Sequence, residues 1–146
     1  MRKTTKTQKQ EQESLFRFYQ PNPLGEKKAK RIGDCTIRAI TKIEQISWLE
    51  AYDRLYEIGR SIFELPNSMT TIRKYLEKQG YERVAIKAVK GSKRPTIESF
   101  TQEHKTGTYL VQVANHVVAV SDGHFFDSWN SGKKSLYSYY IKQESE

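Results

Sequence analysis

The chain has 146 residues, of which 36% are hydrophobic, and this is the size of one domain with a single buried core. Its one cysteine excludes an intramolecular disulfide, which suits a reducing compartment. The sequence has no run of 18 apolar residues, and no apolar stretch follows its basic first ten residues. We therefore expect a cytoplasmic protein that is neither secreted nor embedded in a membrane.

The net charge of +8 is distributed unevenly. Residues 1–33 carry nine Lys and Arg against three Glu, a net of +6, whereas residues 34–146 carry a net of +2. We expect residues 1–14 to be a basic, flexible leader and residues 15–146 to form one domain. The leader is interpreted as a solubilising tail, with a nucleic-acid-binding arm as the open alternative.

In chain order, the first elements are a short strand and three helices. Residues 15–19 are typical of a strand, and a Pro- and Gly-rich loop then leads to a helix that begins near Cys35. Ser47 and Glu50 form a capping-box pattern at the start of a second helix, residues 47–60. Apolar residues at helical spacing predict a third helix from residue 69, which ends at Gly80.

The rest of the chain is typical of a sheet. A strand at 81–89 and a short helix at 96–104 are predicted first, and the further predicted strands are 108–113, 116–120, 124–129 and 135–141. Helices first and an antiparallel sheet afterwards indicate an α+β domain. We expect the helix that begins near Cys35 to pack on one face of that sheet.

Cys35 occupies the first turn of its predicted helix. Asp34 is a favourable N-cap residue, and isoleucines follow at helical spacing. Unpaired N–H groups and the positive end of the helix dipole favour a thiolate at this position. The neighbouring carboxylate of Asp34 disfavours it, so a basic partner for Cys35 has to come from elsewhere in the chain.

Asp122 and Gly123 predict a two-residue hairpin turn that brings such a partner into place. In this register, residues whose numbers sum to 245 face each other. His116 and Asp127 are then diagonal neighbours on one face, which they share with Val118, Phe125 and Trp129. At this separation the carboxylate of Asp127 can hold the imidazole of His116 and leave its other ring nitrogen for a sulfur.

Three short strings resemble the papain-like cysteine peptidase fold. They are residues 33–35, Gly-Asp-Cys at a helix start; residues 115–120, Asn-His-Val-Val-Ala-Val on a strand; and residues 127–129, Asp-Ser-Trp. Their chain order is that of the papains, and the short length and the Asp are more similar to the bacteriocin-processing cysteine peptidase domains. The longer string Gly-Asp-Cys-x-x-Arg-Ala-Ile, residues 33–40, also resembles that of short phage and Gram-positive bacterial proteins. The resemblance spans residues 22–140.

The resemblance implies Cys35 as nucleophile, His116 as general base and acid, and Asp127 as the residue that orients His116. Asn130 is the alternative third member, since papain-like enzymes use either residue type. Papain-like enzymes also carry a Gln six residues before the Cys, where this chain has Ala29. Either Asn22 or Lys30 supplies the missing oxyanion donor, or the hole is incomplete.

The resulting hypothesis is a hydrolase or acyltransferase that acts on a peptide, isopeptide or amide bond of a protein or peptide through a thioester. Two alternatives stay open: an inactive papain-like interaction protein that binds a host protein, and a nucleic-acid-binding protein that uses the basic leader and residues 27–31. We expect no metal and no nucleotide cofactor, because His104 and His124 lack further ligands at metal spacing and no phosphate-binding loop is present.

Overall fold

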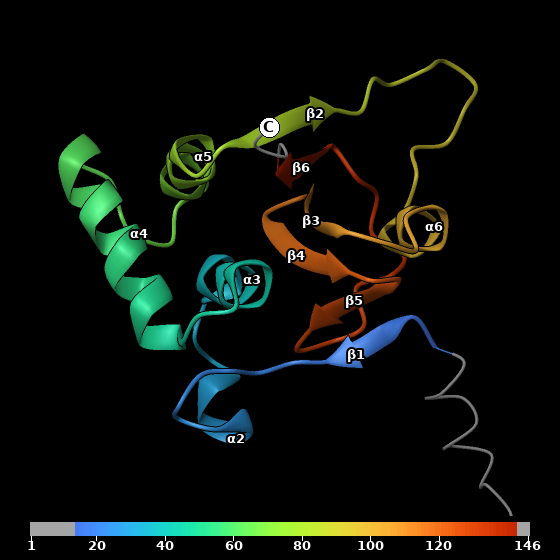
Figure 1. Cartoon of the computed structure of the whole chain (residues 1–146). Coiled ribbons are helices and arrows are strands. Elements are labelled where there is room, and N and C mark those ends of the chain that lie inside the picture. The colour runs from blue at the N-terminus through green and yellow to red at the C-terminus, as the bar shows by residue number, and fades with distance from the viewer. Residues whose placement is uncertain (1–13, 143–146) are drawn as a thin grey trace, which may run out of the picture.

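The structure is a computed structural model that describes residues 14–142, within which the chain forms five helices and six strands (Figure 1). The helical part comes first and most of the strands follow, as the sequence predicts for the α+β class. The elements are, in order, β1 (Phe16–Phe18), α2 (Glu26–Ala29), α3 (Cys35–Glu44), α4 (Trp48–Ile62), α5 (Met69–Lys78), β2 (Tyr81–Ala85), α6 (Ile97–Glu103), β3 (Thr108–Val113), β4 (His116–Ser121), β5 (His124–Asp127) and β6 (Ser138–Lys142).

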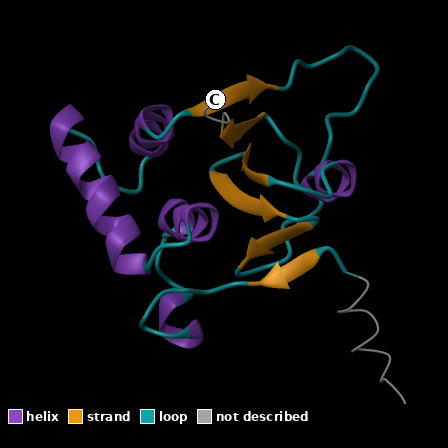
Figure 2. Cartoon of the chain, in the orientation of Figure 1, coloured by secondary structure: helices purple, strands orange, loops and turns teal. Residues whose placement is uncertain are grey.

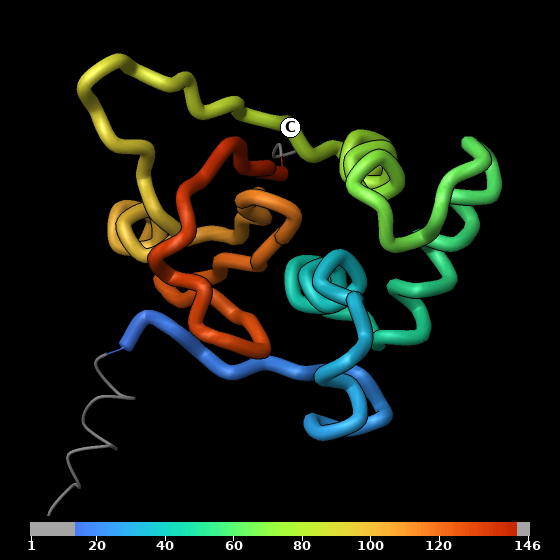
Figure 3. The backbone as a smooth tube through the Cα atoms, turned by 180° about the vertical axis from the view of Figure 1, so that it is seen from behind, coloured from blue at the N-terminus to red at the C-terminus, as the bar shows by residue number. Residues whose placement is uncertain are grey.

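All six strands belong to one sheet, in the order β1-β5-β4-β3-β6-β2. The pairs from β5 to β2 are antiparallel, which agrees with the predicted C-terminal sheet. The edge strand β1 instead pairs parallel with β5, so the sheet is mixed. Figure 3 shows this N-terminal segment, in blue, running beside the orange-red C-terminal segment. The parallel pairing matters for the site because it places Phe18 opposite Asp127.

Helices cover both faces of the sheet and divide the core into two clusters (Figure 2). Helices α3, α4 and α5 lie on one side, where α3 packs on β4 through Val117 and Ala119. Helix α6 lies on the other side and packs against the side chains of Val118, Val120 and Phe125. Helix α3 therefore packs on one face of the sheet, as predicted.

The helix ends follow the predicted signals closely. The side chains of Ser47, Ser68 and Thr96 each accept a hydrogen bond from a backbone N–H in the first turn of α4, α5 and α6. Gly80 follows α5 with a φ of 86°, a conformation that favours glycine. These local contacts fix where the helices begin and end, and so where the sheet can begin.

The predicted leader falls almost wholly outside the described residues, since only Ser14 of residues 1–14 is described. Its hydroxyl accepts a hydrogen bond from the N–H of Phe16 at 3.1 Å. Between residues 14 and 142 there is no helix with both the length and the apolar character needed to cross a bilayer.

Candidate active site

Cys35 is the first residue of α3 and is half-buried. Asp34 occupies the N-cap position, but the prediction that its side chain caps the helix is wrong, because that side chain accepts no hydrogen bond from the first turn. Its carboxylate instead binds Arg38 Nη1 at 2.8 Å and Trp48 Nε1 at 2.9 Å. Asp34 is only 1% exposed, so a buried guanidinium is a better partner for its charge than a backbone N–H.

The β4–β5 hairpin has the register predicted from its turn. Val120 faces Phe125 and Ser121 faces His124, and both residues of the Asp122-Gly123 turn have positive φ, 48° and 81°. As a result, His116 at the start of β4 lies beside Asp127 at the end of β5. His116 Nε2 is 2.6 Å from Asp127 Oδ2, which leaves Nδ1 as the ring nitrogen that can face a sulfur.

His116 and Asp127 lie at the ends of their strands, and this position allows contact with a helix on the other side of the sheet. Strand alternation puts His116 on the same face as Val118, which packs towards α6. Asp127 nevertheless reaches helix α3 on the other side of the sheet, where Arg38 Nη2 donates to its Oδ1 at 3.0 Å. The candidate site therefore lies at the end of the sheet, and not on the middle of either face.

Four groups form hydrogen bonds with the carboxylate of Asp127. Besides His116 and Arg38, the hydroxyl of Ser131 donates to Oδ2 at 2.6 Å and the N–H of Ser128 donates to Oδ1 at 2.7 Å. Burial acts to raise the pKa of Asp127, but the hydrogen bonds from His116 and Ser131 and the charges of His116 and Arg38 outweigh it and lower that pKa. The residue thus stays ionised although it is 1% exposed.

Cys35 and His116 shift each other's protonation in opposite directions. Burial acts to raise the pKa of the Cys35 thiol, but hydrogen bonds from His116 and the N–H of Val117, with the charges of His116 and Arg38, lower it overall. Burial acts to lower the pKa of His116, yet its hydrogen bonds to Asp127 and Cys35 raise that pKa to about 9. The contacts therefore favour the charged forms of both groups, a thiolate beside an imidazolium.

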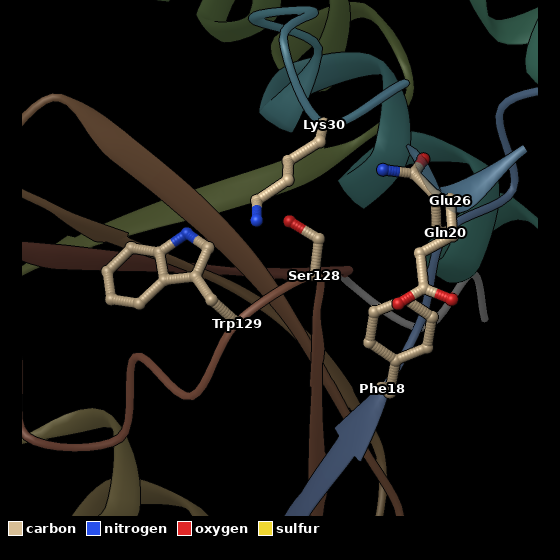
Figure 4. A pocket seen from close by; sticks show the side chains of 6 residues that line it. All are labelled: Phe18, Gln20, Glu26, Lys30, Ser128 and Trp129. Atoms are coloured by element: carbon tan, nitrogen blue, oxygen red, sulfur yellow. The ribbon is translucent and has the colours of Figure 1, made fainter. Parts of the chain in front are cut away.

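A pocket of about 370 Å³ is lined by two residues that contact the triad, Ser128 and Trp129 (Figure 4). Trp129 forms part of its wall, and the indole also lies against the imidazole of His116 with ring centroids 5.2 Å apart. The amine of Lys30 points towards Ser128 and Trp129. The lining residues are Phe18, Gln20, Glu26, Lys30, Ser128 and Trp129. A substrate group in this pocket would contact Trp129, which packs against the candidate general acid.

The two predicted oxyanion donors differ in their surroundings. Lys30 is exposed and lines the pocket beside the triad. Asn22 is buried, and its amide is engaged elsewhere: Nδ2 donates to Asp34 at 3.2 Å and Oδ1 accepts the N–H of Leu24. Ala29, at the position where papain-like enzymes carry a Gln, is 1% exposed and supplies no polar side chain.

The other polar candidates lie away from the triad. Asn130 accepts the N–H of Gly132 at 3.1 Å, and His116 pairs with Asp127 instead. His104 stacks on Phe100 with ring centroids 3.8 Å apart, and His124 Nε2 lies 2.9 Å from Arg17. Among the described residues, His, Cys, Asp and Glu side chains form no group of three that could hold a metal ion.

Two contacts of Asp127 have no counterpart in the sequence-based predictions. The first is Arg38, which lies on α3 one helical turn after Asp34. The second is Ser131, which lies four residues after Asp127 in an irregular segment. A buried carboxylate requires several donors, so the prediction of Asp127 on an apolar face implied such partners without naming them.

No protein-family model, curated protein or solved structure matches this chain. Its function therefore has to be inferred from the geometry of the site itself.

Proposed function

We propose that the protein is a cysteine-dependent hydrolase or acyltransferase with a papain-like arrangement, in which Cys35, His116 and Asp127 act as a triad on a peptide, isopeptide or amide bond. The observation that carries the proposal is the 2.6 Å contact between His116 and a buried, ionised Asp127. This contact orients the imidazole and leaves one ring nitrogen for Cys35. A protein or peptide substrate and a reducing, cytoplasmic location fit this chemistry.

In the first step, the thiolate of Cys35 attacks the carbonyl carbon and the carbonyl electrons move onto oxygen. The tetrahedral intermediate collapses, the C–N bond breaks, and the imidazolium of His116 gives its proton to the leaving amine. A thioester on Cys35 remains. In the second step, neutral His116 takes a proton from water or from an acceptor amine, which attacks the thioester and releases Cys35 as thiolate.

The oxyanion of this reaction has two kinds of donor available. N–H groups in the first turn of a helix lack partners inside that helix, and Cys35 is at the start of α3. Lys30, which lines the adjoining pocket, is the better side-chain candidate because the Nδ2 of Asn22 already donates to Asp34. Water held in the pocket beside His116 would serve hydrolysis, and an amine bound there would serve transfer.

Trapping the thioester tests this proposal. The full chain is incubated with a panel of activated acyl esters and thioesters, and the modified residue is identified by mass spectrometry. We expect a single acyl group on Cys35, no acyl group on the Cys35→Ala variant, and much slower labelling of His116→Ala. Acylation that is confined to lysines, or that is equally fast in His116→Ala, would exclude the proposed chemistry.

The second candidate function is an interaction protein that has the same arrangement but no turnover. Two features favour it: Ala29 has no polar side chain, and the buried amide of Asn22 already uses one of its two N–H donors on Asp34. In this case Cys35 would be alkylated readily but would not turn over any acyl substrate. Binding of a protein partner would then be the same for the wild type and for Cys35→Ser.

A further inference from the structure

Arg38 joins two buried carboxylates at the centre of the candidate site. It lies one turn after Cys35 on α3, and its guanidinium donates from Nη1 to Asp34 at 2.8 Å and from Nη2 to Asp127 at 3.0 Å. Arg38 is 6% exposed, and both carboxylates are 1% exposed. The two contacts use separate nitrogens, so the planar fork of the guanidinium spans the distance between the nucleophile helix and strand β5.

We propose that Arg38 is a positioning residue of this site, which links the helix that carries Cys35 to the carboxylate that orients His116. Its contact to Oδ1 of Asp127 leaves Oδ2 directed at His116 Nε2. Its contact to Asp34 neutralises the carboxylate next to the nucleophile. This inference rests on the proposed triad, since it concerns how that triad is held.

The charges around Cys35 show why a cation is needed here. With a thiolate and an imidazolium present, the charges of Cys35 and of the groups linked to it through His116 and Arg38 sum to −1 when Arg38 is included and to −2 without it. The other two donors to Asp34, the amide of Asn22 and the indole of Trp48, carry no charge. The groups counted are Asp34, Cys35, Arg38, His116 and Asp127.

A purely structural role for Arg38 would have a different signature from a positioning role. In either case, loss of a buried ion pair lowers the stability of the fold. Loss of the positive charge near the thiolate raises the pKa of Cys35 in Arg38→Met. The positioning role adds a second rise, because Asp127 no longer holds one orientation, and this part persists in Arg38→Lys, which keeps the charge. The variant Asp34→Asn is the control, because it disturbs the same ion pairs. It removes a negative charge beside Cys35 and therefore does not raise the pKa of Cys35.

Titration of the single thiol by its ultraviolet thiolate absorbance separates these roles. The full chain is compared with Arg38→Met, Arg38→Lys and Asp34→Asn, and each variant is corrected for tyrosine absorbance with a matched Cys35→Ser chain. We expect Arg38→Met to raise the pKa of Cys35 by about one unit, so that roughly tenfold less thiolate is present below the pKa. Arg38→Lys shifts it in the same direction by less, because an ammonium keeps the charge but cannot bridge both carboxylates.

The outcomes distinguish this inference from the proposed function. A lowered Cys35 pKa in the wild type that stays unchanged in Arg38→Met would overturn the role of Arg38 and leave the triad intact. If Arg38→Met does not fold, an unchanged pKa in Arg38→Lys overturns that role equally. An equal rise in Asp34→Asn would also overturn it, because it would indicate general disruption. An ordinary thiol pKa in the wild type would contradict the triad itself.

Discussion

Asp127 is the side chain on which most contacts of the candidate site converge. Arg38, His116 and Ser131 all direct a hydrogen-bond donor at its carboxylate. The substitution Asp127→Asn would place an NH2 group, which is itself a donor, against these donors. It would also remove the negative charge that balances the imidazolium of His116. We expect this variant to slow the alkylation of Cys35 by at least about tenfold. The measurement is the rate with iodoacetamide near neutral pH on protein whose fold is checked by circular dichroism.

Asn130→Ala is the matched control for this prediction. Within the described residues Asn130 accepts the N–H of Gly132 and does not bond His116, so its loss should leave the alkylation rate of Cys35 within about twofold of the wild type. If Asn130→Ala were the slower variant, the pairing of His116 with Asp127 would not be the arrangement that activates Cys35.

The raised pKa of His116 links protonation of this residue to the stability of the fold. Its pKa is about 9 in the folded chain against an ordinary 6.5, so the folded state holds the proton more tightly than the unfolded state. The stabilisation from His116 is then fully present below 6.5 and is lost as the pH rises through about 9. Cys35 acts in the opposite direction, since its lowered pKa contributes stability that is lost at acid pH.

We therefore make the comparison in a Cys35→Ser background, where the opposing titration of the thiol is absent. Between the ordinary His pKa of 6.5 and about 9, the free energy of unfolding of Cys35→Ser should fall more steeply than that of the Cys35→Ser/His116→Ala double variant, because Asp127 still raises the pKa of His116. Urea unfolding at several pH values within this window provides the measurement. Parallel curves for the two chains would show that His116 does not hold a proton more tightly in the folded state.

At the level of elements, the β4–β5 hairpin sets the register that brings His116 and Asp127 together. Gly123 has a φ of 81°, and a Cβ there would meet no atom closer than 3.4 Å. Gly123→Ala should therefore cost about 1–2 kcal/mol through backbone strain alone. Because the buried residues of both strands also specify the register, we expect the melting temperature to fall while the alkylation rate of Cys35 stays unchanged.

A large fall in Cys35 reactivity in Gly123→Ala, with the fold retained, would show that the turn alone holds the register. Gly91→Ala serves as the reference for the strain, since Gly91 has a φ of 86° in a loop and no atom within 4 Å of its Cβ position.

Local signals in the sequence were enough to predict most elements and the hairpin register, because caps, turn residues and alternation act over a few residues. The parallel pairing of β1 with β5 could not be predicted, since it joins Phe16 to Phe125 without a local signal. The link from Arg38 to Asp127 was missed for the same reason, as it joins a helix to a strand 89 residues away. Asp34 was assigned to the helix cap because propensity takes no account of its burial beside Arg38.

The whole molecule shows that the N-terminal part of the domain supports the site. The N–H of Tyr19 donates to the backbone carbonyl of Asp127 at 2.8 Å, and β1 forms the edge beside β5. Removing residues 1–19 should therefore lower the melting temperature and slow the alkylation of Cys35. Removing residues 1–13, which lie outside the described part, should leave both unchanged, because β1 keeps its pairing with β5 and Tyr19 keeps its bond to Asp127. Equal loss in both truncations would contradict this account.

The uneven charge of the whole chain provides a test of the nucleic-acid alternative. The lysines at 27, 28 and 30 are exposed, and the sequence of residues 1–13 is also basic. If these groups bound phosphates, the affinity for DNA or RNA would fall steeply with salt and would drop on removal of residues 1–13. We expect only such weak, sequence-independent binding, with the same affinity for Cys35→Ala. Tight binding at high salt that depends on Cys35 would contradict this expectation.

The central claim is that His116 makes Cys35 a nucleophile, and the pH dependence of Cys35 alkylation tests it most directly. The rate is measured with iodoacetamide across the pH range for the wild type and for His116→Ala. We predict that the wild-type rate rises with an apparent pKa below that of an ordinary thiol, which is ~8.5, and that His116→Ala returns it to that value. A wild-type rate that rises only near ~8.5 and is unchanged in His116→Ala would contradict the account.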